Sequence, residues 1–208
     1  MSQSTKLRPF QTSVFNLLSA GKSVLLQAPT GSGKTRAALY PYLHWLAEHL
    51  RQPDGLTPLP TTCRYAVPLR VLATQFFREY EQAGVNIDAY LSTSLQQTYN
   101  RFGQRIVAVQ TGEQPDDPQF ESALTFCTID QLLASFLGIP YGLGARRANL
   151  NVAAVIGSYL VFDEFHLYPL ARDSAGYGAR TTVLQMLELL HQRERRLTPF
   201  VLMTATFS

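Results

Sequence analysis

The sequence predicts an α/β domain in which a mostly parallel β-sheet is covered by helices on both faces. Segments of strand length alternate with helical segments along the 208 residues, and this order of elements builds parallel sheets. Several strand segments, such as 159–162, are apolar at every position, which is typical of strands buried on both faces. Since no repeat or linker divides the chain, we expect residues 1–208 to form a single domain.

Helical spacing and apolar runs predict each element in order. Phe10, Val14 and Leu18 repeat at helical spacing. Pro9 suits the first turn of this helix, and Gly21 ends it. Strands are expected at 23–27, 64–67, 85–90, 105–109, 124–128, 159–162 and 200–203. The remaining helices are expected at 36–50, 69–82, 129–137 and 175–195, with loops at 51–62, 113–119 and 138–150.

Composition and charge indicate a globular protein. Hydrophobic residues make up 46% of the chain and charged residues 16%, which excludes a disordered polymer. The formal net charge of +3 permits nucleic-acid binding without requiring it. The two cysteines, Cys63 and Cys127, are expected as buried strand residues in a reducing compartment, without a zinc site. The sequence shows neither a signal segment nor an apolar run of about 20 residues, so we expect a cytoplasmic protein with no membrane contact.

A phosphate-binding loop, or P-loop, is predicted between the strand at 23–27 and the next helix. Its glycines allow a tight turn in which successive N–H groups point at one anion, and the helix adds the positive end of its dipole. Lys34 supplies a full charge for the β- and γ-phosphates, and the Thr35 hydroxyl is suited to ligate Mg²⁺. Ala28 stands where the general motif has glycine. The residues expected to hold the nucleotide are Ala28, Pro29, Thr30, Gly31, Ser32, Gly33, Lys34 and Thr35.

A pair of carboxylates follows the apolar strand at 159–162. Asp163 and Glu164 would lie at the carboxyl end of this strand, where ligands of open α/β sheets bind. In a P-loop enzyme the first carboxylate lies beside Mg²⁺, and the second can hold and deprotonate the water that attacks the γ-phosphate. We therefore expect Asp163 at the metal with Thr35, and Glu164 as the catalytic base.

Together these segments resemble the motifs of the superfamily 2 DExD/H-box helicases, over nearly the whole chain and as the first of that family's two RecA-like domains. The P-loop resembles motif I, residues 163–166 (DEFH) motif II, and 204–206 (TAT) motif III. Gln11, in LRPFQ, resembles the glutamine that reads adenine. Segments that resemble motifs Ia, Ib and Ic are 68–75 (PLRVLATQ), 110–113 (QTGE) and 128–132 (TIDQL).

The resemblance implies an ATP-dependent motor with ATP and Mg²⁺ bound, and with single-stranded nucleic acid, DNA in preference to RNA, as its partner. Lys34, Asp163 and Glu164 would be catalytic. The residues implied to couple the nucleotide site to nucleic acid are His166, Thr204 and Thr206. Those implied at the nucleic-acid backbone are Arg70, Thr111, Gly112 and Thr128.

Purely structural interpretations of these residues stay open. Thr128 could be the N-cap of its helix, and Arg70 could be an ordinary surface residue. Thr111 and Gly112 could form a plain turn, because turns favour the same residue types. His166 could be a packing histidine.

Within superfamily 2, the segments 127–133 (CTIDQLL) and 163–168 (DEFHLY) are most similar to the CRISPR-associated helicase of type I interference systems. No HD nuclease signature precedes the P-loop, so the resemblance implies a separate HD nuclease and a crRNA-guided surveillance complex as partners. The family's arginine fingers come from a second RecA-like domain, and we expect that the chain is truncated before one. We therefore expect these 208 residues to bind nucleotide weakly and to hydrolyse ATP slowly or not at all.

Three other functions stay open. An RNA helicase or the motor of a restriction system fits the same motifs, since nothing in the sequence clearly reads a 2′-hydroxyl. A small-molecule P-loop kinase or GTPase would leave the TAT and LRPFQ segments unexplained. A binding module could hold nucleotide and a partner without turnover.

Overall fold

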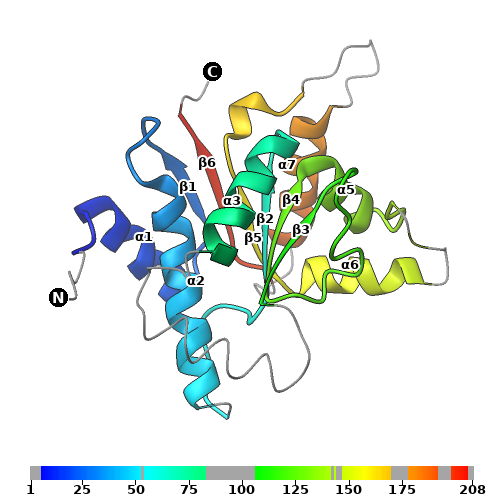
Figure 1. Cartoon of the computed structure of the whole chain (residues 1–208). Coiled ribbons are helices and arrows are strands. Elements are labelled where there is room, and N and C mark those ends of the chain that lie inside the picture. The colour runs from blue at the N-terminus through cyan, green and yellow to red at the C-terminus, as the bar shows by residue number, and fades with distance from the viewer. Residues whose placement is uncertain are drawn as a thin grey trace.

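The computed structural model describes residues 6–52, 54–82, 106–141, 143, 147–169, 178–191 and 198–205. Within these residues one six-stranded sheet has the order β1-β6-β5-β2-β4-β3, and every neighbouring pair is parallel (Figure 1). The predicted parallel α/β fold is therefore confirmed. The strands are β1 (Val24–Gln27), β2 (Cys63–Val67), β3 (Val107–Gln110), β4 (Leu124–Thr128), β5 (Tyr159–Phe162) and β6 (Phe200–Thr204).

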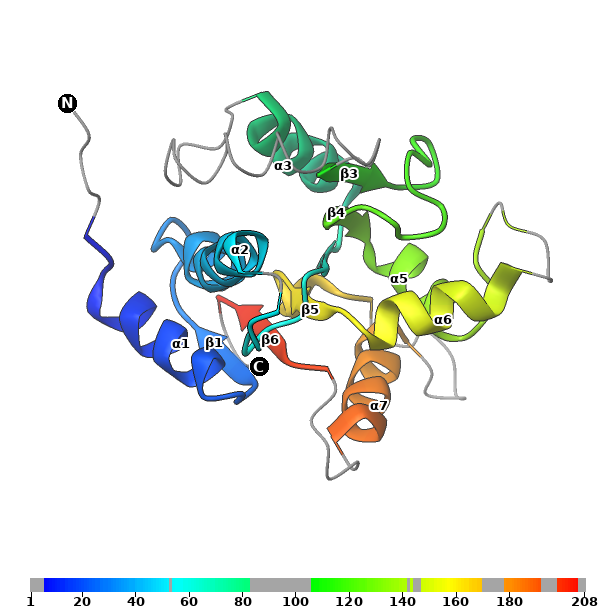
Figure 2. The same cartoon turned by 90° about the horizontal axis from the view of Figure 1, so that it is seen from below.

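Helices cover both faces of this sheet, as the sequence predicts. The core on one face joins α1, α2 and α3 to strand residues such as Tyr65 and Phe126. The core on the other face joins α5, α6 and α7 to strand residues such as Ala66 and Leu160. Figure 2 shows α2 and α3 on one side of the strands and α7 on the other. The helices are α1 (Pro9–Ser19), α2 (Lys34–Arg51), α3 (Arg70–Gln82), α5 (Ile129–Phe136), α6 (Ala148–Ile156) and α7 (Ala179–His191), with a short 3₁₀ helix η2 (Phe165–Leu167).

The first helix begins and ends where its residue types favour. Pro9 occupies the first turn of α1, where its missing N–H has no cost. The backbone N–H of Arg8 donates a hydrogen bond to Gln11 Oε1 at 2.9 Å and so closes that turn. Beyond the end of α1, Gly21 adopts a φ of 69°, a left-handed conformation that glycine tolerates.

A buried arginine fixes the loop between β3 and β4. Arg64 in β2 is 1% exposed. Its guanidinium donates hydrogen bonds to the backbone oxygens of Phe120 and Ser122 and to the Thr125 hydroxyl. That hydroxyl in turn donates to Asp117 Oδ2 at 2.7 Å. Because these partners come from the loop and from β4, the network holds the loop after the predicted motif Ib against the sheet.

Two helices differ from the sequence expectation. Residues 148–150, expected in a loop, form the first turn of α6. The α6 sequence, ANLNVAAVI, has no charged residue, so it lacks the polar stripe that marks a surface helix. Helix α7 begins at Ala179, later than the expected start at 175. The expected strand at 85–90 lies outside the described residues, as do 175–177 and 192–195 of the expected last helix.

Both cysteines lie in the sheet, as predicted, with Cys63 in β2 and Cys127 in β4. Each is buried and is a free thiol. The described residues contain no group of three or more His, Cys, Asp or Glu side chains that could hold a metal ion. In the same part of the chain, no helix combines the length and the apolar character that crossing a membrane requires.

Candidate nucleotide site and nucleic-acid interface

The carboxyl ends of all six strands meet at one edge of the sheet because every neighbouring pair is parallel. The strand order groups the predicted motifs along this edge. Strands β1, β6 and β5 are neighbours. The P-loop therefore follows β1, Thr204 ends β6 and Asp163 follows β5 along one half of the edge. Strands β2, β4 and β3 form the other half of the sheet. Arg70 lies shortly after β2, Thr128 is the last residue of β4, and Thr111 directly follows β3. The fold thus separates the residues expected to bind nucleotide from those expected to bind nucleic acid.

The P-loop turns through two glycines in the left-handed region. The φ angle is 74° at Gly31 and 93° at Gly33, values that other residues adopt only at a cost. Gly33 is the N-cap of α2, which begins directly at Lys34. A Cβ atom on Gly33 would lie 2.8 Å from Gln11 Nε2, so a side chain at this position would displace the Gln11 amide from its hydrogen bond with the loop. The result is the strand, tight turn and helix that phosphate binding needs.

Lys34 points back into its own loop and toward the acidic pair. The residue is buried, and its Nζ donates hydrogen bonds to the backbone oxygens of Ala28 at 3.0 Å and Pro29 at 3.3 Å. The same nitrogen lies 3.6 Å from Glu164 Oε1. The structure therefore brings the lysine and the acidic strand end to one point, which is the arrangement a shared nucleotide site requires.

Hydroxyl groups connect Asp163 with the start of α2. Tyr65 Oη donates a hydrogen bond to Asp163 Oδ2 at 2.6 Å and lies 3.4 Å from Thr35 Oγ1. The other carboxylate oxygen of Asp163 accepts a hydrogen bond from the backbone N–H of Glu164 at 2.9 Å. Burial raises the pKa of the Asp163 carboxyl, although the hydrogen bond from Tyr65 opposes this rise. Burial, with the Asp163 charge, also raises the pKa of Tyr65, so the phenol keeps its proton.

Glu164 occupies an unusual backbone conformation. Its φ of 48° and ψ of 46° are left-handed, and Phe120 is the other non-glycine residue with positive φ in the described part of the chain. Its Oε2 lies 3.4 Å from His166 Nδ1. This oxygen is buried and has no hydrogen-bond partner among the described residues. A buried oxygen without a donor is suited to accept one from a bound water, and backbone strain of this kind is common at functional sites.

A histidine and a threonine join the acidic strand end to the last strand. His166 Nδ1 and Thr204 Oγ1 lie 3.1 Å apart. The backbone oxygen of Thr204 accepts a hydrogen bond from Ala28 N at 3.2 Å. Thr204 therefore contacts both the P-loop and the predicted motif II, whereas Thr206 lies outside the described residues.

Gln11 contacts the P-loop backbone. Its Nε2 donates a hydrogen bond to the Gly33 oxygen at 3.1 Å, and its Oε1 accepts the bond from Arg8 N. The Arg8 guanidinium also donates to the backbone oxygen of Ser32. The start of α1 thus supports the loop from outside. Adenine recognition by Gln11 stays a prediction, for which one N–H and one lone pair of the amide remain.

Arg70 and Gly112 are exposed, as a contact with nucleic acid requires. Arg70 is the first residue of α3, and its guanidinium pairs with the carboxylate of Glu113. A surface hollow of about 410 Å³ lies beside this pair. It is lined by Arg70, Val71, Thr74, Gln75, Arg78 and Glu113.

The side chains of Thr111 and Thr128 lie below the surface. The Thr111 hydroxyl accepts a hydrogen bond from Gln114 N at 3.1 Å, which is the turn arrangement kept open above. Thr128 stands at the N-cap position of α5 but makes no side-chain capping bond, and its hydroxyl has no partner among the described residues. Neither of these hydroxyls is presented at the surface for a phosphate.

Two residues that sequence reasoning missed hold the acidic strand end in place. One is Tyr65, described above. The other is Arg180 in α7, whose guanidinium donates to the backbone oxygen of His166 and lies 5.8 Å from the centre of the Phe165 ring. A fully buried tyrosine needs a partner for its hydroxyl, and that was the available signal at Tyr65. It did not reveal which strand would supply the partner.

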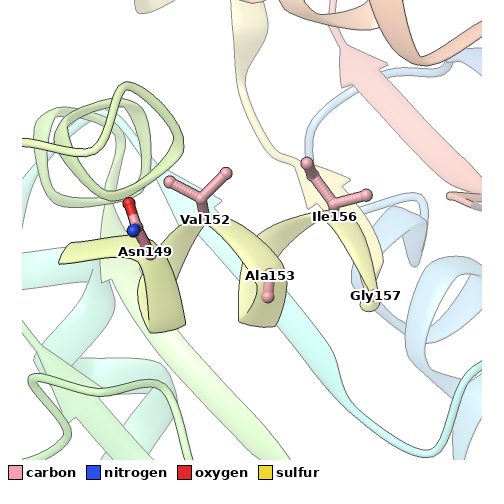
Figure 3. Close-up of a pocket in the computed structure, with 5 residues that line it drawn as sticks. All are labelled: Asn149, Val152, Ala153, Ile156 and Gly157. Carbon is pink, nitrogen blue, oxygen red and sulfur yellow. The ribbon is translucent and has the colours of Figure 1, made fainter. Parts of the chain in front are cut away.

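An apolar hollow of about 590 Å³ runs along α6 (Figure 3). Helix α6 precedes β5, so this hollow adjoins the start of that strand, whereas Asp163 follows its end. The lining has no charged group that would bind a phosphate. The residues that line it are Asn149, Val152, Ala153, Ile156 and Gly157.

The residues present fit a magnesium nucleotide. Ser32 Oγ in the P-loop is buried without a hydrogen-bond partner among the described residues. Lys34 Nζ contacts the backbone oxygens of Ala28 and Pro29 and the Glu164 carboxylate, which a phosphate can replace. The Thr35 hydroxyl and the Asp163 carboxylate both lie within reach of the Tyr65 hydroxyl. Hydroxyl and carboxylate oxygens are the ligands that Mg²⁺ prefers.

A P-loop and a strand that ends in two carboxylates, on one parallel sheet with helices on both faces, define a RecA-like NTPase domain. Comparison with protein families agrees, because residues 8–208 match the DEAD/DEAH box helicase family. The chain belongs to that family.

Two relatives match shorter segments. An 83-residue segment is 34% identical to the ATP-dependent rRNA helicase SPB4 of Candida albicans and covers 36% of this chain and 13% of that protein. A 75-residue segment is 37% identical to the DExH-box ATP-dependent RNA helicase DExH13 of Arabidopsis thaliana and covers 36% of this chain and 3% of that protein. The matched segments are thus small parts of much longer proteins.

Solved helicase structures share the fold. The DUF1998 helicase MrfA, in a structure bound to DNA and AMPPNP, superposes with a TM-score of 0.62 at 18% identity, over 99% of this chain and 25% of that one. A hypothetical ATP-dependent RNA helicase from Sulfolobus tokodaii gives a TM-score of 0.50 at 18% identity, over 98% of this chain and 47% of that one. Identities this low show the fold alone.

Proposed function

We propose that this chain is the ATP-binding and ATP-hydrolysing domain of a longer superfamily 2 motor that translocates on or unwinds nucleic acid. The observation that carries the proposal is the approach of Lys34 Nζ to Glu164 Oε1 at 3.6 Å. This approach supports the proposal because a cation that binds the phosphates would then lie beside the carboxylate proposed as the base. Membership of the DEAD/DEAH box helicase family supports the same function.

The site residues divide the chemistry between them. Lys34 exchanges its carbonyl partners for the β- and γ-phosphate oxygens of ATP. Thr35 and Asp163 would hold Mg²⁺, which would neutralise charge on the phosphates. Glu164 orients the attacking water and takes its proton on Oε2, the oxygen that has no hydrogen-bond partner in the described part of the chain.

Coupling to nucleic acid would run through β6. Thr204 at the end of this strand touches His166 through its side chain and Ala28 through its backbone. A shift of β6 would therefore move both sides of the nucleotide site together. The arginine fingers of such motors come from a second RecA-like domain, so these 208 residues alone should turn over ATP slowly.

The partner proposed is the backbone of a single strand, contacted through Arg70 and Gly112 without reading sequence. MrfA has been captured with DNA, whereas SPB4 and DExH13 are named as RNA helicases. These relatives favour a helicase outside CRISPR interference over the CRISPR helicase. The CRISPR hypothesis rests only on the resemblance of segments 127–133 and 163–168.

Glu164→Gln tests the motor, with Glu81→Gln as the matched control because Glu81 is an exposed glutamate of α3. A fluorescent ATP analogue measures binding, and phosphate release measures turnover with single-stranded DNA or RNA of the same sequence. We expect Glu164→Gln to bind as tightly as the wild type and to lose at least about 100-fold in turnover. The contrary outcome is a wild type that binds ATP but has no turnover, or only turnover that Glu164→Gln leaves unchanged, even when a second RecA-like domain is added. That outcome would identify a non-catalytic binding module.

A further inference from the structure

Tyr65 reaches the candidate metal site from the core of the sheet. It lies in β2, the strand beside β5, and its side chain is fully buried. Its ring packs against Phe76 at 5.4 Å and Phe126 at 5.3 Å between ring centres. These contacts fix the ring, so the position of the hydroxyl is set by the core and not by a mobile loop.

The hydroxyl bridges the two residues that fit Mg²⁺. It donates its one proton to Asp163 Oδ2 at 2.6 Å, and its oxygen lies 3.4 Å from Thr35 Oγ1. Asp163 Oδ1 is held by the backbone N–H of Glu164. The carboxylate is therefore oriented by one donor on each oxygen, and each oxygen keeps a lone pair for another partner.

We propose that Tyr65 is a positioning residue for magnesium. Its hydroxyl orients the Asp163 carboxylate and the Thr35 hydroxyl toward a common point before the metal binds. The inference rests on the proposed function, since it assumes that these two oxygens share a magnesium nucleotide. Groups that orient metal ligands commonly change metal affinity by about 10- to 100-fold when removed. A tyrosine that served the core alone would leave metal affinity unchanged.

Tyr65→Phe tests this role because it removes one oxygen and keeps the ring. Binding of a fluorescent ADP analogue is titrated in EDTA and over a range of Mg²⁺ concentrations. We expect the Mg²⁺ concentration for half-maximal enhancement to rise about tenfold, with binding in EDTA unchanged. In an Asp163→Ala background, Tyr65→Phe should no longer change the Mg²⁺ dependence.

Tyr159→Phe is the matched control. Tyr159 in β5 is also fully buried. Its hydroxyl donates a hydrogen bond to the backbone oxygen of Ala38 in α2 at 2.9 Å. The inference would be overturned if Tyr65→Phe raised the half-maximal Mg²⁺ concentration no more than Tyr159→Phe does. It would also be overturned if Tyr65→Phe weakened nucleotide binding equally in EDTA and in Mg²⁺. A wild type that binds no nucleotide overturns the proposed function and this inference together, and is a distinct result.

Discussion

Lys34 and Glu164 face each other across the candidate site, with the lysine nitrogen 3.6 Å from the Glu164 Oε1 atom. Both residues are largely buried, and each also has a second contact, Lys34 with loop carbonyls and Glu164 with His166. A γ-phosphate that attracts Lys34 would also release Glu164 from its counter-charge. On the proposed function, this ion pair would link nucleotide binding to the release of the proposed base.

The left-handed backbone of Glu164 gives a first prediction about stability. Glu164→Gly and Glu164→Ala lack the same side chain but differ in the cost of a φ of 48°. We expect the glycine variant to be more stable by about 1 kcal/mol in its free energy of unfolding, measured by urea denaturation. At Gln75, an exposed position in the middle of α3, the order should reverse by about 1 kcal/mol. The same order at both sites would mean that Glu164 is not strained.

The two P-loop glycines should respond differently to alanine. At Gly31 a Cβ atom meets nothing within 4 Å, so Gly31→Ala should cost only the roughly 1 kcal/mol of its left-handed conformation. At Gly33 the new Cβ would also meet Gln11 Nε2 at 2.8 Å. We expect Gly33→Ala to destabilise the fold further and Gln11→Ala to relieve part of that excess in the double variant. Equal losses at both glycines would show that the contact with Gln11 is unimportant.

Much of this fold follows from local patterns in the sequence. The strands β4 and β5 begin and end where their apolar runs predict, and the P-loop and acidic strand end were located from residue types and neighbouring elements. These signals are local, since a buried parallel strand is apolar throughout and a P-loop needs glycines at fixed spacing. Helix α6 was missed because ANLNVAAVI has no polar stripe.

The contacts between strands could not be predicted in the same way. Tyr65 meets Asp163 only because β2 lies beside β5, and that adjacency is a property of the sheet order. The burial of the Thr111 and Thr128 hydroxyls likewise depends on how the ends of β3 and β4 pack. Motif spacing predicted which residues approach the site, whereas their partners required the three-dimensional arrangement.

Arg64 should be important for stability because removing its guanidinium leaves several buried hydrogen-bond acceptors without a donor. Arg64→Met leaves the backbone oxygens of Phe120 and Ser122 without their donor and Asp117 without its nearby charge. We expect a loss of about 3 kcal/mol in the free energy of unfolding, measured by urea denaturation. Arg78→Met, at an exposed position of α3, should change it by less than about 0.5 kcal/mol. Adding Asp117→Asn to Arg64→Met should cost less than Asp117→Asn alone, and full additivity would contradict the coupling.

Glu113 is expected to restrain nucleic-acid binding, because its carboxylate pairs with Arg70. Glu113→Gln frees the guanidinium for a phosphate, so affinity for a fluorescent single strand should rise several-fold at low salt. The slope of log affinity against log salt should become steeper by about 0.7, the value for one added phosphate contact on a single strand. Glu81→Gln makes the same charge change far along α3 and should leave the slope unchanged. A gain that persists in an Arg70→Ala background would assign the effect to net charge alone.

The buried thiols predict a loss of stability at alkaline pH. Burial raises the pKa of both Cys63 and Cys127 from the ordinary value of 9.0, so the thiols stay protonated in the folded protein and ionise on unfolding. Above about pH 9 the unfolded chain therefore binds fewer protons than the folded one, and the free energy of unfolding falls as pH rises. Each thiol contributes a slope of up to about 1.4 kcal/mol per pH unit there. Denaturant titrations between pH 7 and pH 10.5 should show a flatter decline in a Cys63→Ala, Cys127→Ala variant than in the wild type. The decline that remains belongs to the buried tyrosines, whose pKa values burial also raises, and an identical decline in both proteins would contradict the assignment to the thiols.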